Sequence, residues 1–159
     1  MDSIAEGRRQ WEKHYASDAA LGLTAISSAA RAAHLLRAGA EDALAPFGVS
    51  FAHFELLTLL MWSRSGALPM SKISTRLHMP PASLTHTVRR LEGQGLVARV
   101  TDEKDKRSTL LTITDQGIAL ASAAGPVLSD YCASLDQDAA AKLVDAAAIF
   151  RRAAGDDVE

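Results

Sequence analysis

The chain has 159 residues, of which 48% are hydrophobic and 5% aromatic, and its formal net charge at pH 7 is −2. This length predicts one domain, and the hydrophobic content excludes a disordered chain, because it is enough to form a buried core. A single cysteine, Cys132, excludes an intramolecular disulfide framework and favours a reducing cytoplasm.

Apolar runs give no indication of secretion or of a membrane span. The charged start "MDSIAEGRRQWEKH" contains no apolar segment of the kind found in signal peptides. The longest mainly apolar run, "LLTLLMW" at residues 56–62, is too short to cross a bilayer. We therefore expect a cytoplasmic protein without a membrane partner.

Charge is distributed unevenly along the chain. Between Ser71 and Leu110 there are eight cationic and four anionic residues, a net charge of +4, so the remainder carries −6. A basic segment between acidic flanks is typical of a nucleic-acid-binding element on a neutral scaffold. An ordinary solvated face is the alternative interpretation, and charge alone does not decide between them.

The N-terminal third is predicted to be helical after a loose start of about ten residues. Leucines and one isoleucine recur among many alanines from Asp18 to Ala45, which predicts one long helix that Pro46 and Gly48 end. Ser50 is then placed to cap a second helix, whose apolar residues recur at helical spacing from Phe51 until Gly66.

Two further helices follow a connector, "ALP". Ser71 is expected to cap a short helix over residues 72–78, and "MPP" then breaks the chain, with Pro81 in a first helical turn. The next helix, residues 82–95, has a buried stripe of Leu84, Val88 and Leu91 and ends at two glycines. We assign six polar residues to its outer face: Ser83, Thr85, His86, Thr87, Arg89 and Arg90.

A hairpin and two helices complete the chain. The segments "LVARV" (96–100) and "STLLTI" (108–113) read as strands on either side of a polar tip that holds Lys104, Lys106 and Arg107. Thr114 is placed to cap a helix that runs to about Cys132, and a last helix covers residues 138–154. We expect the tail "GDDVE" to be loose.

The chain has a short helix, a break, a helix with a polar face and a hairpin with a cationic tip, in that order. This order is typical of a winged helix-turn-helix, which binds DNA through the second helix and the wing. The expected fold is mostly α with a small β-hairpin wing. Asp105 is expected to hold the Arg107 guanidinium in a fixed direction for the minor groove. The candidate DNA-binding residues are Ser71, Lys72, Ser83, Thr85, His86, Thr87, Arg89, Arg90, Arg99, Lys104, Asp105, Lys106 and Arg107.

Two segments resemble the MarR family of bacterial transcription regulators. "DKRSTLLTITDQG", residues 105–117, is similar to the family's wing, and "MPPASLTHTVRRLEGQGLV", residues 79–97, is similar to its recognition helix. The resemblance implies a homodimer joined through the first and the last two helices. Many relatives have two adjacent arginines after the wing aspartate, but here the first is Lys106, which lacks the planar guanidinium; minor-groove insertion is therefore assigned to Arg107.

The same resemblance suggests the organisation of the chain and a site for an effector. We expect an N-terminal arm and dimerisation helix at 1–48, the winged helix-turn-helix lobe at 49–114 and C-terminal dimerisation helices at 115–159, all in one compact unit. A small aromatic or phenolic effector would contact Trp11, Tyr15, His34, His53 and Glu55. Packing of Trp11 and Tyr15 in the dimer interface is the favoured alternative, and His34 and His53 are then surface groups or satisfied interface histidines.

Catalytic and metal-binding motifs are not found. The sequence has no phosphate-binding glycine loop, nucleophile elbow or paired histidine motif, so we expect neither an enzyme nor a cofactor or metal site. Cys132 has no cation beside it in sequence to lower the pKa of a thiol, and we expect it to be buried and structural rather than a sensor of oxidants.

These patterns favour a ligand-responsive DNA-binding regulator, a repressor that binds a pseudo-palindromic operator as a homodimer. A winged-helix protein-interaction module that does not bind DNA is the alternative, and the net charge of −2 keeps it open.

Overall fold

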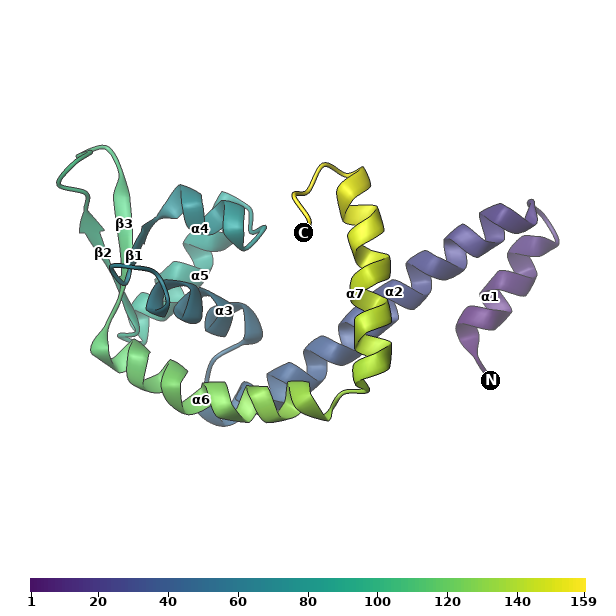
Figure 1. The fold of residues 1–159 in the computed structure, drawn as a ribbon, viewed down its shortest axis with the longest axis horizontal. Coiled ribbons are helices and arrows are strands. Elements are labelled where there is room, and N and C mark those ends of the chain that lie inside the picture. The colour runs from purple at the N-terminus through teal and green to yellow at the C-terminus, as the bar shows by residue number, and fades with distance from the viewer. The chain divides into compact units, whose positions relative to one another are not determined.

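Helices form most of the chain, and one small antiparallel sheet completes it (Figure 1). The computed structural model describes every residue from Met1 to Glu159 and divides into two units, Met1–Asp42 and Ala43–Glu159. The expected fold class, mostly α with a β-hairpin wing, is confirmed.

The N-terminus is helical, so the expectation of a loose start was wrong. Helix α1 spans Ser3–Glu12, and the Asp2 side chain caps it by accepting hydrogen bonds from two backbone N–H groups. Glu6 accepts hydrogen bonds from Gln10 and Arg9, both at 2.6 Å. These two contacts lower the pKa of the Glu6 carboxyl. Side-chain pairs one turn apart therefore support a helix that has no buried residue.

Helix α2 spans Ser17–Leu44, within one residue of the predicted bounds. Several large apolar side chains on it are exposed in the single chain, among them Leu21, Ile26 and Leu35. By length and composition alone, residues 17–47 are long and apolar enough to cross a membrane, a test that core helices of soluble proteins also pass; 6% of the 18-residue apolar window within this helix is buried. Polar residues such as Thr24, Ser27 and Arg31 interrupt the apolar residues of this helix, so it contains no long apolar run in the sequence.

The second unit begins with the 3₁₀ turn Ala45–Phe47 and helix α3, Phe51–Met61. Ser50 caps α3 as predicted: its hydroxyl accepts from the His53 N–H at 3.1 Å, and His53 Nδ1 accepts from the Ser50 N–H at 3.4 Å. The helix ends five residues before Gly66, earlier than expected.

The connector "ALP" is a strand, β1 (Ala67–Pro69), which corrects the prediction. It pairs antiparallel with β3 (Thr109–Ile113), and β3 pairs on its other side with β2 (Val97–Thr101), so the strand order is β1-β3-β2. Three residues are too few to show an alternating pattern, and the hydrogen-bond partners of β1 come from a distant part of the chain.

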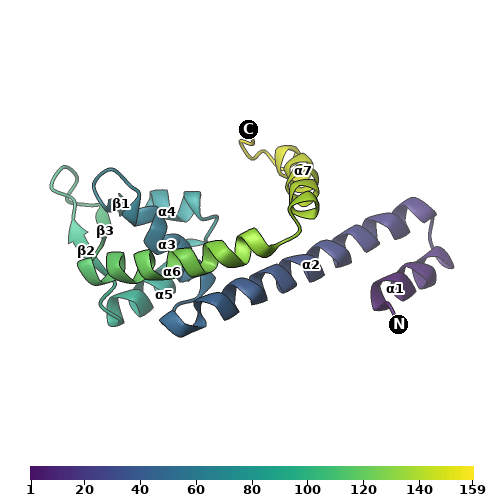
Figure 2. The same ribbon diagram turned by 60° about the horizontal axis from the view of Figure 1, so that its bottom comes forward.

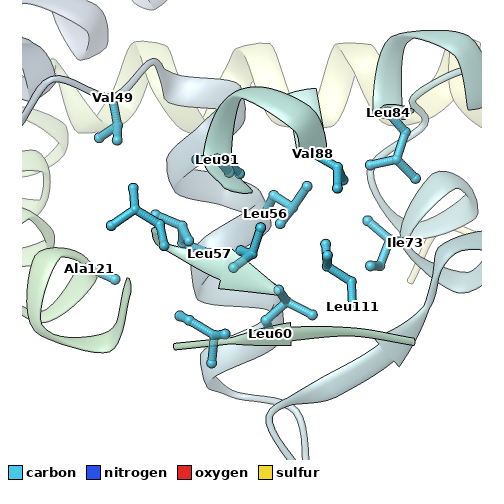
Figure 3. Close-up of a cluster of buried hydrophobic side chains, with 13 residues drawn as sticks. Val49, Leu56, Leu57, Leu60, Ile73, Leu84, Val88, Leu91, Leu111 and Ala121 are labelled. Atoms are coloured by element: carbon cyan, nitrogen blue, oxygen red, sulfur yellow. The ribbon is translucent and has the colours of Figure 1, made fainter. Parts of the chain in front are cut away.

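Helices α4 (Met70–Arg76) and α5 (Pro81–Gly93) form the helix-turn-helix. The expected cap at Ser71 was wrong: α4 starts at Met70, two residues before the expected start at Lys72, and it follows Pro69 without a side-chain cap. Pro81 is the first residue of α5, as predicted. The buried stripe of α5 is also confirmed, and it packs into the main core with residues from α3, α4 and β3 (Figure 3).

Helices α6 (Asp115–Ser134) and α7 (Gln137–Ala153) complete the unit and meet at an angle of 93°. Thr114 caps α6 as predicted, and α6 packs against α3 (Figure 2), where the Ser122 hydroxyl contacts Met61 Sδ at 3.8 Å. Cys132, on the last turn of α6, is exposed in the single chain, so the expectation of a buried cysteine was wrong here. The tail has no regular structure, although Asp156 pairs with Arg151 at 2.9 Å.

Candidate nucleic-acid interface

Helix α5 has one apolar and one polar face, and packing of the apolar face into the core leaves the polar face exposed. Leu84, Val88 and Leu91 are fully buried, so the opposite face of the helix points to solvent. Four of the six polar residues assigned to the outer face are exposed, and Thr85 is half-buried. Thr87 is the exception, since it is only 9% exposed and belongs to the buried face. Its assignment to the outer face was wrong. The exposed four are Ser83, His86, Arg89 and Arg90.

The turn between α4 and α5 is fixed by backbone and side-chain hydrogen bonds. The Ser74 hydroxyl donates to the Met79 carbonyl oxygen at 2.6 Å, and the Met79 N–H donates to the Ser74 carbonyl oxygen at 3.0 Å. His78 has a left-handed backbone conformation, with φ of 49°. This turn sets the angle at which α5 leaves α4.

A groove lies between α4 and the first turns of α5. Its volume is about 450 Å³, and it is lined by Met70, Ser71, Ser74, Thr75, Pro81, Leu84 and Thr85. A smaller hollow of about 280 Å³ shares Ser71 and Thr75 with it and reaches Lys72 and Arg76. Ser71 and Lys72, both expected to contact DNA, are thus exposed beside the N-terminal end of α5. Arg76 was counted among the cations of the basic segment but not assigned to the site.

The wing is the β2–β3 hairpin with its tip at residues 102–108 (Figure 1). Lys104, Lys106 and Arg107 are exposed at this tip, as predicted. Asp102 Oδ1 accepts from the Lys104 N–H at 2.9 Å, and Asp105 Oδ1 accepts from the Arg107 N–H at 3.0 Å. Two carboxylates therefore order the backbone of the tip.

The role expected for Asp105 was different. The sequence predicted that its carboxylate holds the guanidinium of Arg107, but the carboxylate binds the backbone N–H of Arg107 instead. The guanidinium has no ion pair within the chain. It therefore remains available for an external anion.

Arg99 differs from the other cations of the basic segment. Its Nε lies 3.3 Å from Glu92 Oε1, on the last turn of α5. The pair connects the recognition helix to the base of the wing.

The residues expected to contact an effector are divided between the two units. Trp11 and Tyr15 contact each other in the first unit, with ring centroids 4.8 Å apart, and His34 is exposed on α2. His53 caps α3 and Glu55 is exposed on the same helix, in the second unit. Their common role stays a prediction. No group of three or more His, Cys, Asp or Glu residues between Met1 and Glu159 is arranged to hold a metal ion.

Comparison with known proteins places this lobe in one family. The model of the MarR family matches residues 51–109. The HTH-type transcriptional repressor Rv2887 of Mycobacterium tuberculosis is 32% identical over 113 residues, which are 71% of this chain and 77% of that protein. The crystal structure of Sco5413, a MarR family transcriptional regulator from Streptomyces coelicolor, superimposes with a TM-score of 0.77 at 38% identity, over 87% of this chain and 98% of that one.

Further relatives include a DNA complex and a regulator that matches over a shorter stretch. The transcriptional repressor CouR, whose structure was solved bound to a 23-mer DNA duplex, has a TM-score of 0.67 and 26% identity over 76% of this chain and 87% of its own. The organic hydroperoxide resistance transcriptional regulator of Bacillus subtilis is 35% identical over 41% of this chain. The chain spans less than half the length of that regulator and of three further curated relatives, between 41% and 45%.

Proposed function

Since this chain belongs to the MarR family, we propose that it binds double-stranded DNA and regulates transcription. The observation that carries the proposal is the pairing of an exposed polar face on α5 with a cationic wing tip in one lobe. Major-groove reading requires an exposed helix face with hydrogen-bonding side chains, and minor-groove or backbone contact requires a thin cationic element beside it. Both are present in the segment 81–107.

In this proposal α5 enters the major groove and its outer residues contact base edges. His86, Arg89 and Arg90 are the exposed groups with the reach to do so. Ser71 and Lys72 at the start of α4 contact phosphates. The wing follows the backbone and inserts Arg107 into the minor groove, while Lys104 and Lys106 neutralise phosphates as point charges.

The structure of the repressor CouR on a 23-mer duplex supports DNA as the partner, because this chain shares its fold at 26% identity. The relatives described above are all named as transcriptional regulators or repressors. A protein that binds chromosomal DNA would act in the cytoplasm, and this location is part of the proposal.

We further propose that the protein is a homodimer. Helices α2 and α7 each expose several large apolar side chains in the single chain, and such surfaces on a helix are normally covered. Covering them with a second copy would assemble residues 1–48 and 115–159 into a dimerisation region. Two-fold dimers of helix-turn-helix lobes read half-sites roughly 34 Å apart, about one helical turn of DNA.

Repression and response to a ligand complete the proposal. Rv2887 and CouR are named repressors, which favours repression over activation. In this proposal an aromatic or phenolic effector favours a form of the dimer in which the spacing of the two recognition helices does not match the spacing of the DNA half-sites. The residues proposed to contact the effector are Trp11, Tyr15, His34, His53 and Glu55. A coupling free energy of ~1–3 kcal/mol is enough to change operator occupancy several-fold.

Selection of bound sites from a random pool of DNA duplexes, at two salt concentrations, tests the proposal. Enrichment of an inverted repeat is expected for a dimer that reads sequence. Binding without enrichment would indicate backbone contacts only. Absence of binding even at low salt would overturn DNA binding and favour a winged-helix module that binds a protein, an alternative that the charge of −6 outside the basic segment supports.

A further inference from the structure

We infer that Arg99 is a positioning residue that acts through Glu92 and sets the direction of the wing relative to the recognition helix. This inference rests on the proposed function, because its consequence is an effect on DNA affinity. It replaces the expectation that Arg99 itself contacts DNA.

The strand register places Arg99 on the inner face of the wing. In an antiparallel pair, residues directly opposite each other project to the same face of the sheet. Val97 lies opposite Ile113, and Arg99 lies opposite Leu111. The three apolar residues Val97, Leu111 and Ile113 are all buried in the core. Arg99 therefore lies on the face of β2 that packs on the core, although its side chain is 38% exposed.

Glu92 is the group that Arg99 meets on that side. The distance from Arg99 Nε to Glu92 Oε1 is 3.3 Å, and the two side chains are 38% and 31% exposed. An acid in the last turn of a helix is unfavourably placed with respect to the helix dipole, whose C-terminal end is negative. It is also unfavourably placed beside a DNA backbone. Pairing with Arg99 gives Glu92 a favourable partner in a position where a carboxylate is otherwise disfavoured.

The pair spans the turn that joins α5 to β2. Only residues 94–96 lie between these elements, and Gly95 takes a left-handed conformation with φ of 73°. The side chain of Gln94 and the hydroxyl of Thr114 anchor this turn, by donating to the carbonyl oxygens of Gly48 at 3.1 Å and Gly95 at 2.7 Å. Those bonds hold the turn itself, whereas the Glu92–Arg99 pair joins the helix to the strand beyond it and so fixes the angle between them.

Salt-dependent DNA binding of Gln variants separates positioning from contact. If Arg99 acts through Glu92, then Arg99→Gln and Glu92→Gln each weaken binding by a similar factor, on the order of two- to five-fold for a partly exposed pair. The double variant is then no weaker than either single variant. The slope of log affinity against log salt stays at the wild-type value, because no phosphate contact is lost.

A direct contact predicts the opposite pattern. If Arg99 binds a phosphate, Arg99→Gln lowers the magnitude of the salt slope by about 0.9, as expected for one neutralised phosphate. Glu92→Gln then strengthens binding, because it removes a negative charge near the DNA. Either result would overturn the inference. The exchanged variant, Glu92→Arg with Arg99→Glu, should recover binding to within about two-fold of the wild type if a partly exposed pair only positions the wing, and a further loss would also overturn it.

Two controls keep the outcomes separate. Arg107→Ala, measured on the same duplex, shows that the loss of one wing cation is detectable in the slope. Circular dichroism of each variant confirms that it is folded. Failure of the wild-type protein to bind any duplex would overturn the proposed function and this inference together, whereas wild-type binding that Glu92→Gln does not weaken would overturn the inference alone.

Discussion

Gly117 lies so close to Leu96 that a Cβ built on the glycine would stand 2.2 Å from the Leu96 carbonyl oxygen. The same carbonyl oxygen accepts a hydrogen bond from the Thr114 N–H at 3.1 Å. The first turn of α6 is therefore in backbone contact with the start of the wing, directly after the recognition helix. This contact connects the C-terminal helices to the element that is proposed to bind DNA.

Gly117→Ala should destabilise the protein by about 1–3 kcal/mol or more, because the new methyl group meets backbone that cannot move without shifting the wing. The measurement is urea unfolding at a fixed protein concentration, since a dimer's stability depends on concentration. Gly93→Ala is the matched control. A Cβ at Gly93 meets nothing within 4 Å, so this variant should retain or gain stability, by up to about 1 kcal/mol. Equal stability of the two variants would contradict the steric argument.

Periodicity of apolar residues was sufficient to predict the long helices and the buried stripe of α5, because in these segments burial and spacing coincide. It failed for α1, which is supported by a cap at Asp2 and by pairs such as Arg9–Glu6 instead of an apolar stripe. It also failed for β1, whose pairing of Leu68 with Leu111 joins residues that are far apart in sequence. Local patterns contain no information about such a partner.

The sequence predicted the exposed polar face of α5 and the cationic wing tip, but it predicted the placement of single residues less well. Thr87 is three residues after Leu84 and four before Leu91, so helical spacing already placed it on the buried face, and its polar character was misleading. The spacing of Asp105 and Arg107 allowed the carboxylate to bind either the guanidinium or the backbone N–H of Arg107, and the sequence could not distinguish between these two partners. The orientation of Arg99 could not be predicted, because it depends on the strand register.

Phe150→Asp should convert the proposed dimer into a folded monomer. Leu143, Ala147 and Phe150 recur at helical spacing on one face of α7, and Phe150 is 72% exposed in the single chain. A charge there would be buried against the second copy without a partner, while the monomer would lose little, because most of the side chain is exposed in the single chain. Sedimentation or light scattering measures the mass directly.

Ile149→Asp is the control for this prediction. Ile149 is 65% exposed, similar to its neighbour, but it shares a helix face with the charged residues Lys142 and Asp145. It should therefore leave the dimer intact. A dimer that persists in Phe150→Asp, or that is lost equally in both variants, would exclude this face of α7 as the specific interface.

Arg107→Ala should weaken binding to every duplex by about ten-fold or more, since one charge-assisted hydrogen bond contributes about 1.5–3 kcal/mol. The salt slope should fall by about one, because a wing cation contacts the DNA backbone and minor groove regardless of sequence. Lys142→Ala removes a cation of α7 that pairs with Asp138 at 2.6 Å, and it should change neither quantity. An unchanged slope in Arg107→Ala would exclude this residue from the DNA interface.

Substitutions on α5 should instead change which bases are preferred. His86 is exposed near the N-terminal end of the helix, so His86→Ala should relax selectivity at one base pair, where a good contact contributes about 1–3 kcal/mol of discrimination. The Thr85 hydroxyl already donates its proton to the Pro81 carbonyl oxygen at 2.9 Å. Only its lone pairs remain, so Thr85 can accept from an adenine or cytosine amino group but cannot donate to guanine or thymine oxygens.

Site selection repeated with each variant measures these preferences. Thr85→Val keeps the shape of the side chain and removes the acceptor, so enrichment of adenine or cytosine at one position of each half-site should disappear. Thr87→Val is the matched control, because the same change at a buried position leaves the outer face unaltered. If Thr85→Val and His86→Ala both lower affinity uniformly, with the selected sequence unchanged, then these residues only contact the backbone and sequence is read by Arg89 and Arg90.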